Sequence, residues 1–265
     1  MPLWVWACIY GFVVCQLSGL ATTIYLHRSA THRAFSLSPW VALPMRFHLW
    51  LFTGIVVREW VAVHRKHHHF TDEPGDPHSP LLEGVWQILA GNPIYYRRAA
   101  NDDEIVRAYA KDIPVRRYDR WLLDHGNLGI ALGLLLSVGA MRLAGGSWLA
   151  AAVAGAAAYL GQGFGYIVAN ALVNGACHAF GYRNFDNTAT NLRWVAWLSA
   201  GEGLHNNHHQ YPSAGKLSIA RHETDPAWPV IRLLAKLRLV QLKPLPRAFL
   251  ADQSRLCEQP VNSNC

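Results

Sequence analysis

The sequence predicts an all-α integral membrane protein with about three transmembrane helices, an interfacial helix and a cytoplasmic helical cap. Its composition is one reason: 51% of the 265 residues are hydrophobic and only 15% are charged, whereas soluble domains average about a quarter charged residues. Three long apolar runs are the second reason. The third is that lysine and arginine avoid those runs almost completely. We expect one membrane-embedded domain over residues 1–265, because no repeat or linker divides the chain.

The first transmembrane helix is expected at about residues 3–26. This stretch carries no charged side chain and exceeds the roughly 20 apolar residues that cross a bilayer. A cleaved signal peptide would need a basic start, and no lysine or arginine precedes the run. We therefore interpret the run as a membrane anchor.

Two further spans are expected at about residues 124–144 and 147–173, separated by the turn sequence AGGS. The second of them is rich in glycine and alanine, which let transmembrane helices approach closely. Residues 41–57 are also apolar, but Arg46 and His48 interrupt them. That segment is predicted to be an interfacial or re-entrant helix rather than a full span.

The distribution of basic residues predicts the orientation. Residues 1–26 contain no lysine or arginine, and residues 127–173 contain only Arg142; the rest lie in 27–126 and 174–265. Three crossings put both basic blocks on one side, which the positive-inside rule makes cytoplasmic. The N-terminus is then outside. The net charge of +7 in so apolar a chain disfavours nucleic acid as a partner. The five cysteines form no C-x-x-C pair, so no cysteine-based zinc site is expected.

All 14 histidines lie in the two basic blocks, and nine of them form motifs close to the ends of the apolar runs. Two clusters, HRKHH and HNNHH, share the spacing i, i+3, i+4, which places three imidazoles on one helix face. Asn174 and His178 are four apart and are expected on one face as well. His27 and His32 are five apart, about 140° around an α-helix, so we expect the helix to end between them. His69 is also five from His64 and is expected to point away.

Nine imidazoles exceed the ligands of one ion, since a structural zinc takes four. They suit two ions with coordination numbers near five or six, and imidazole binds iron, zinc, copper and nickel. Apart from His69, the remaining histidines are interpreted as ordinary surface or hydrogen-bonded residues: His48, His78, His125 and His222.

Four motifs together resemble the membrane-bound fatty-acid desaturases, above all the stearoyl-coenzyme A (Δ9-type) group. They are HRSATHRAF, EWVAVHRKHHHFTDEPGDPH, VNGACHAFGYRNFDN and GEGLHNNHHQYP, in that order. The resemblance implies a centre of two iron ions held by nine histidines and by a water that an asparagine binds. Carried over motif by motif, the water-binding residue is Asn174 and the ligands are His27, His32, His64, His67, His68, His178, His205, His208 and His209.

The resemblance also implies the reaction and the partners. The reaction is oxygen-dependent desaturation that introduces a cis double bond into a fatty acyl chain carried by coenzyme A, a carrier protein or a lipid. The electrons come from an external donor, and the basic cytoplasmic blocks favour an acidic one, such as a ferredoxin or a cytochrome b5-like protein with its reductase. The expected location is the cell inner membrane if the source is bacterial.

Ligating histidines normally donate their second N–H to a carboxylate or carbonyl. The acidic candidates near the motifs are Glu59, Asp72, Asp76, Asp186 and Glu202. Trp60 and the stretch GDPH (75–78) lie beside the second cluster, and the resemblance places this region at the substrate entrance. An ordinary Pro/Gly turn is the alternative for GDPH.

Two alternative functions remain open at this point. A hydroxylase or related oxygenase would use the same two irons on a lipid or alkyl chain. A non-enzymatic membrane metal-binding protein is the other, although a transporter would place its ligands near the bilayer midplane, and these histidines lie at the ends of the runs.

Overall fold

The computed structural model describes residues 1–258 and is mostly helical. The α-helices are α1 (Leu3–Ala21), α2 (Pro39–Thr53), α3 (Val57–Phe70), α4 (Pro80–Glu83), α5 (Val85–Ala100), α6 (Asp103–Tyr109), α7 (Gly126–Leu143), α8 (Trp148–Asn174), α9 (Arg193–Leu198), α10 (His205–Gln210), α11 (Ala227–Lys236) and α12 (Arg247–Glu258). Two π-helical segments, η1 (Thr22–Thr31) and η2 (Asp119–Leu123), and one 3-10 turn, η3 (Ala176–His178), adjoin them. The strands β1 (Phe35–Leu37) and β2 (Val240–Leu242) pair antiparallel.

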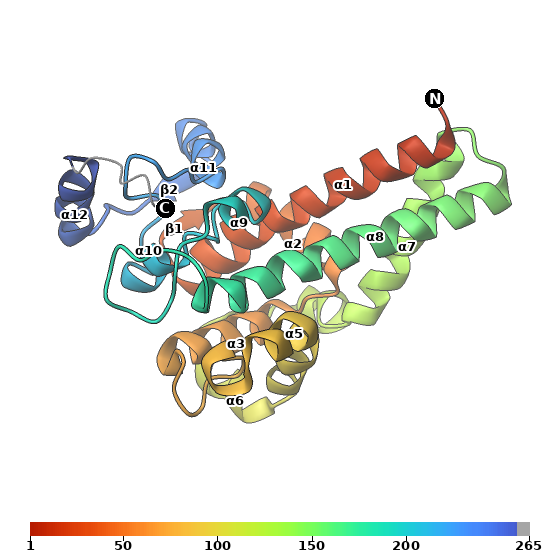
Figure 1. Cartoon of the computed structure of the whole chain (residues 1–265). Helices are drawn as coiled ribbons and strands as arrows, with labels where there is room; N and C mark the ends of the chain where they lie inside the picture. The colour runs from red at the N-terminus through yellow and green to blue at the C-terminus, as the bar shows by residue number, and fades with distance from the viewer. Residues whose placement is uncertain (259–265) are drawn as a thin grey trace.

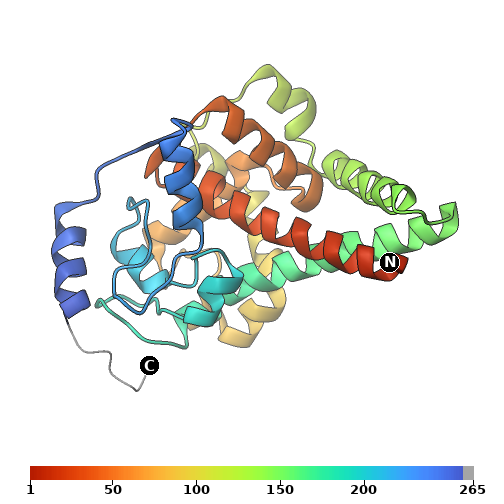
Figure 2. The same cartoon turned by 90° about the horizontal axis from the view of Figure 1, so that it is seen from above.

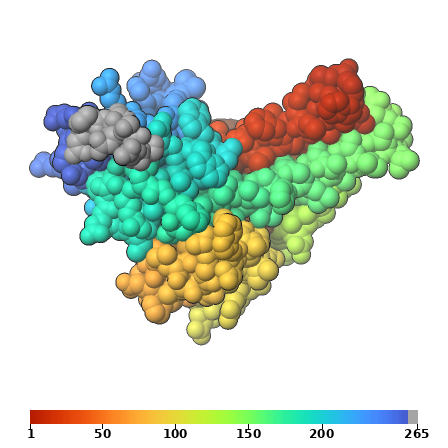
Figure 3. Space-filling view, viewed as in Figure 1, coloured from red at the N-terminus to blue at the C-terminus, as the bar shows by residue number. Residues whose placement is uncertain are grey.

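Within residues 1–258, three helices are long and apolar enough to cross a membrane, as the sequence predicted: Leu3–Thr31, Gly126–Leu143 and Trp148–His178. They form an arm that extends from a broader body (Figures 1 and 3). Small residues bring the backbones together. A Cβ at Gly11 would lie 3.0 Å from the carbonyl oxygen of Ala158, and one at Gly155 would lie 2.6 Å from Cα of Val138. The expected close approach of the glycine-rich run is therefore present.

The segment predicted as interfacial or re-entrant forms α2, which meets α3 at a bend of 88°. Gly54 ends α2 in the left-handed region at φ 66°, a conformation that glycine adopts without strain. The far end of α2 packs into the bundle, where the hydroxyl of Tyr159 donates to the carbonyl of Leu51 at 2.9 Å. The bend makes this pair either a broken span or a re-entrant loop.

The first helix does not end between His27 and His32, so that expectation is wrong. The helix continues as the π-helical η1, in which the N–H of His32 donates to the carbonyl of His27 at 3.1 Å. Because a π-helix bonds residues five apart, residues that would diverge on an α-helix lie one above the other. This wider helical turn brings the two imidazole rings together, with centroids 4.8 Å apart.

The body at the histidine end has two halves. One half contains α3 to α6, and the other contains α9 to α12. The two halves lie on opposite sides of the ends of α1 and α8 (Figure 1), and Figure 2 shows the same arrangement from above. The strand pair Phe35↔Leu242 ties the chain after η1 to the C-terminal part. Ile24, Phe35, Ala227 and Ile231 form the apolar core beneath that pair.

Candidate metal centre

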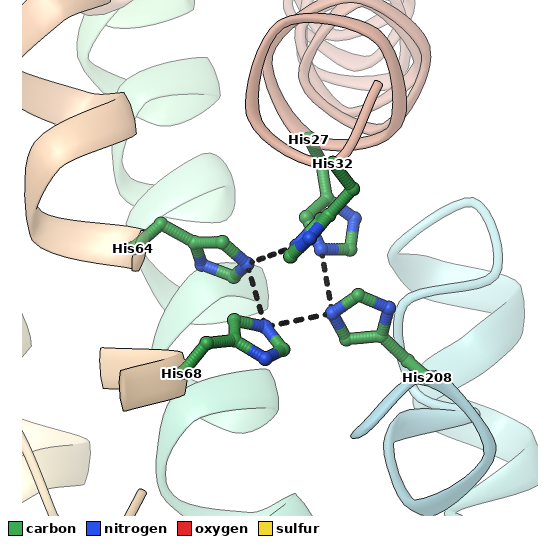
Figure 4. Close-up of side chains that lie close together, drawn as sticks. All are labelled: His27, His32, His64, His68 and His208. Carbon is green, nitrogen blue, oxygen red and sulfur yellow. Dashed lines mark hydrogen bonds between the residues drawn. The ribbon is translucent and has the colours of Figure 1, made fainter. Parts of the chain in front are cut away.

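Five histidines from three separate segments point their ring nitrogens at one spot: His27, His32, His64, His68 and His208. Figure 4 shows them converging from η1, α3 and α10. Their Nε2 atoms form a chain of close contacts. His208 lies 2.9 Å from both His27 and His68, and His64 lies 3.1 Å from His68 and 3.0 Å from His32.

A second group of four histidines lies beside the first: His67, His178, His205 and His209. Nε2 of His209 is 3.1 Å from that of His205 and 3.4 Å from that of His67. The two groups adjoin each other, since the rings of His68 and His209 stack with centroids 4.4 Å apart. All nine histidines singled out from the sequence are therefore brought together, in groups of five and four.

The close nitrogen contacts fit metal ligation better than hydrogen bonding. A neutral imidazole has one N–H, yet Nε2 of both His64 and His208 contacts two other Nε2 atoms. Two nitrogens bound at right angles, each about 2.1 Å from an ion, lie about 3 Å apart, which is the spacing found here. The donor set therefore fits two metal ions held through Nε2.

Three carboxylates orient histidines from behind. Oδ2 of Asp72 lies 2.7 Å from Nδ1 of His178, and Oδ2 of Asp76 lies 2.9 Å from Nδ1 of His67. Oε2 of Glu202 lies 2.6 Å from Nδ1 of His27. Where Nδ1 donates to a carboxylate, as in His67 and His178, the lone pair of Nε2 is free to face an ion. Three of the five acidic candidates thus lie where such partners are needed.

The charge states follow from burial. Burial lowers the pKa of His205, His208 and His209, and neighbouring histidines lower it further. These rings are therefore neutral near pH 7, which is the form that binds a metal. Burial alone would raise the pKa of the Asp72 carboxyl, but hydrogen bonds from His178 and Ser79 hold it below its usual range. That carboxylate stays charged and keeps its histidine in one tautomer.

The two asparagines of HNNHH, Asn206 and Asn207, hold this cluster in place from the side away from the two histidine groups. Nδ2 of Asn206 donates to the carbonyls of Phe185 and Ala189 at 3.0 Å. Nδ2 of Asn207 donates to Oε2 of Glu223 at 2.7 Å. Because these buried amides are satisfied only in one arrangement, α10 has a fixed rotation about its axis despite its length of six residues.

Sequence reasoning missed a buried ion pair beneath His27. The guanidinium of Arg28, 1% exposed, donates to both oxygens of Asp225 at 2.7 and 2.9 Å. Nε of Arg28 is also 3.8 Å from Glu202, the carboxylate behind His27. An arginine at the end of an apolar run indicates that some acidic residue is buried with it. Nothing in the sequence identified Asp225 as that residue.

Three further residues singled out from the sequence, Trp60, Asp186 and Asn174, differ in how they relate to the histidines. Trp60 stacks on His64 with ring centroids 4.9 Å apart. Asp186 is exposed and makes no hydrogen bond to a histidine within residues 1–258, so a role in orienting one is not supported. Helix α8 ends at Asn174, whose side chain donates to Asn92 at 2.9 Å. The shared α-helical face expected for Asn174 and His178 is therefore wrong, because the chain tightens into η3 between them.

Two histidines outside the nine differ in their surroundings. His69 is exposed and stacks on Phe70, away from both groups, as its position in the helix predicted. His78 was interpreted as an ordinary surface or hydrogen-bonded residue, and that is wrong. It is buried against His67, with ring centroids 4.6 Å apart, and neither of its ring nitrogens has a partner in the described chain.

Two cavities adjoin the histidines. A small one of about 50 Å³ touches His27, His64 and His205, and Trp60 and Asn174 also line it. A larger one of about 530 Å³ lies between α3, α5, α7 and α8 and contains Glu59 in its lining. The histidine groups are thus open to internal space on the side of the membrane helices.

Comparison with known proteins gives a consistent answer. The family model described as fatty acid desaturase matches residues 2–242. Similar proteins include the sn-1 stearoyl-lipid 9-desaturase of Anabaena variabilis, 34% identical over 83% of this chain and 77% of the relative. Delta-9 desaturase-like 5 protein of Arabidopsis thaliana is 31% identical over 89% and 76%. The hex-5-enoyl-[acyl-carrier protein] acetylenase of Moorena producens (strain JHB) is 31% identical over 91% and 77%.

Proposed function

Because the chain belongs to the fatty acid desaturase family, we propose that it desaturates a fatty acyl chain at a centre of two irons, using O₂. The observation that carries the proposal is the convergence of nine imidazoles in groups of five and four. Asn174 lies beside the group of four and lines the same small cavity as His205. It is the residue proposed to hold a water as a further ligand.

The reaction removes two hydrogens from adjacent methylenes and forms a cis carbon–carbon double bond. O₂ takes up these hydrogens, two electrons and two protons, and becomes two waters. Bound iron would supply the oxidant needed for an unactivated methylene. The histidines hold the ions, and Asp72, Asp76 and Glu202 fix the ring orientations. The indole of Trp60 covers His64 and forms a wall against which an acyl chain would be positioned.

Product analysis tests this proposal. Expression in a host of known lipid profile should yield a new unsaturated fatty acid, identified by mass spectrometry together with its double-bond position. His208→Ala, expressed to the same level, should yield none. Hydroxylated fatty acids in place of unsaturated ones would contradict the desaturase and support the oxygenase.

The electron donor is proposed to be a small acidic protein, such as a ferredoxin or a cytochrome b5-like protein served by its reductase. Two basic residues, Arg33 and Lys66, support this proposal, because each is next in the chain to a histidine proposed as a metal ligand. Arg33 follows His32 and is exposed, and Lys66 lies between His64 and His67. Positive charge near the centre would steer an acidic partner towards it.

The histidine end is proposed to face the cytoplasm, with the N-terminus on the opposite side. Support comes from the arm, whose N-terminal end lies far from α3 and α10 (Figure 1), because residues 1–26 and 127–173 contain Arg142 as their one lysine or arginine. A reporter fused to the N-terminus should therefore read as external. A cytoplasmic signal would mean that the α2–α3 pair crosses the membrane or that α1 does not.

A further inference from the structure

The larger cavity lies where the membrane helices meet the body. Gly126, Asn127 and Ile130 line it from the first turns of α7, and Ile167 and Asn170 line it from α8. Since α7 and α8 are candidate spans, the cavity sits at the membrane boundary on the histidine side. Its volume of about 530 Å³ is within the usual range for a small-molecule site.

This cavity adjoins the small one that touches the metal ligands. The two share four lining residues, Trp60, Tyr166, Asn170 and Asn174. A chain lying in the larger cavity can therefore continue past Trp60 to His27 and His64. A polar end group would remain behind in the larger cavity.

Two buried polar groups in the larger cavity lack partners. The ring nitrogens of His78, which is 4% exposed, and the hydroxyl of Tyr96 have no hydrogen bond within residues 1–258. Both line the cavity. Buried donors without a partner cost free energy, and a carbonyl oxygen of a bound ligand would satisfy them.

The edge of the cavity is apolar and faces outward. Ile130 and Ile167, which line it, are 40% and 43% exposed, and nearby in the chain Ile94 is 74% and Trp121 82% exposed. Isoleucines and an interfacial tryptophan suit contact with lipid. They do not suit a mouth that opens to water.

The charges argue against a coenzyme A thioester. Its phosphates would need several lysines or arginines, because these recognise phosphate through charge-assisted hydrogen bonds. Among the residues described as lining the cavity, Arg97 is the one lysine or arginine, and Glu59 and Asp124 line it too. This balance suits a neutral ester group.

From these observations we propose that the substrate is a fatty acyl ester of a membrane lipid, which enters sideways from the bilayer past Ile130 and Ile167. The ester carbonyl accepts hydrogen bonds from His78 and Tyr96, and the acyl chain runs past Trp60 to the histidines. This inference rests on the proposed desaturase function and names the substrate class for the same site.

A pulse-chase experiment in intact cells tests the inference. Cells expressing the protein incorporate an isotope-labelled saturated fatty acid into phospholipid, after which fatty acid synthesis and acyl activation are both inhibited. Unsaturation of the labelled phospholipid should continue after the thioester pools are exhausted. If unsaturation occurs before the block but stops with those pools, the lipid-ester inference is overturned while the desaturase stands. Absence of unsaturation in both phases contradicts the desaturase itself.

Variants at the mouth provide the second arm. Ile130→Trp is expected to slow unsaturation about tenfold or more, because the indole overfills the mouth, while iron content stays unchanged. Ile167→Trp tests the same mouth from α8, in case the first variant does not fold. Leu135→Trp, at a lipid-facing position on α7 that is 65% exposed and outside the cavity lining, is the matched control and should retain activity. Unchanged rates in both mouth variants would overturn lateral entry.

Discussion

Oδ2 of Asp72 lies 2.7 Å from Nδ1 of His178, although 106 positions separate the two residues. The contact joins the turn that follows α3 to η3, which follows α8, so two of the segments that supply the histidines are fixed relative to each other. Ser79 donates a second hydrogen bond to Asp72 at 2.7 Å. The carboxylate thus belongs to the turn, and it contacts the group of four histidines through the imidazole of His178.

The first prediction concerns this carboxylate. Asp72→Asn should lower metal affinity about 10- to 100-fold, as loss of an orienting carboxylate typically does. Asparagine is chosen because Asp72 has φ 59°, a conformation that asparagine tolerates well. Iron retained during titration with a chelator measures the effect. Asp186→Asn is the control, and equal retention in the two variants would contradict the orienting role.

The second prediction compares neighbouring histidines. His68→Ala should lose iron and product, because Nε2 of His68 contacts both His64 and His208. His69→Ala should keep both within a few-fold, since its ring is exposed and stacks on Phe70. The measurements are iron content and unsaturated product in parallel preparations. An inactive His69→Ala at normal expression would show that the assignment of ligands on α3 is wrong.

The third prediction concerns the buried pair of Arg28 and Asp225. Asp225→Ala leaves a buried guanidinium without its main partner and should reduce stability by about 3–5 kcal/mol. Arg255→Ala removes an exposed pair with Asp252 and should cost less than about 1 kcal/mol. Thermal unfolding in detergent compares the two. Similar melting temperatures for Asp225→Ala and the unsubstituted protein would refute the importance of the pair.

The fourth prediction concerns the electron donor. Turnover with an acidic protein donor should fall as ionic strength rises, because screening weakens long-range attraction. Turnover driven by a small chemical reductant serves as the control for direct effects of salt on the enzyme. A protein-driven rate that does not change with salt would argue against electrostatic steering.

The sequence predicted much of this molecule because the relevant signals are local. Apolar runs determine which helices are long and apolar enough to cross a membrane, and the spacing of His64, His67 and His68 places them on one face of α3. Asp72 and Asp76 were identifiable because they closely follow that cluster. Such features need only the geometry of one helix or one turn.

Features that depend on tertiary packing were not predictable in this way. The π-helical η1 replaced the expected helix end, because the alignment of His27 and His32 is imposed by the whole site and not by local propensity. Asp225 meets Arg28 across nearly two hundred positions. The burial of His78 depends on how the turn after α3 folds back onto His67. None of these contacts leaves a periodic pattern in the sequence.

The most direct test of the account is the metal content of active protein, purified without loss of metal. Nine converging imidazoles in groups of five and four predict about two irons per chain, and His208→Ala should reduce that number in parallel with activity. A preparation with measured desaturase activity that contains one zinc and no iron would contradict the two-iron centre.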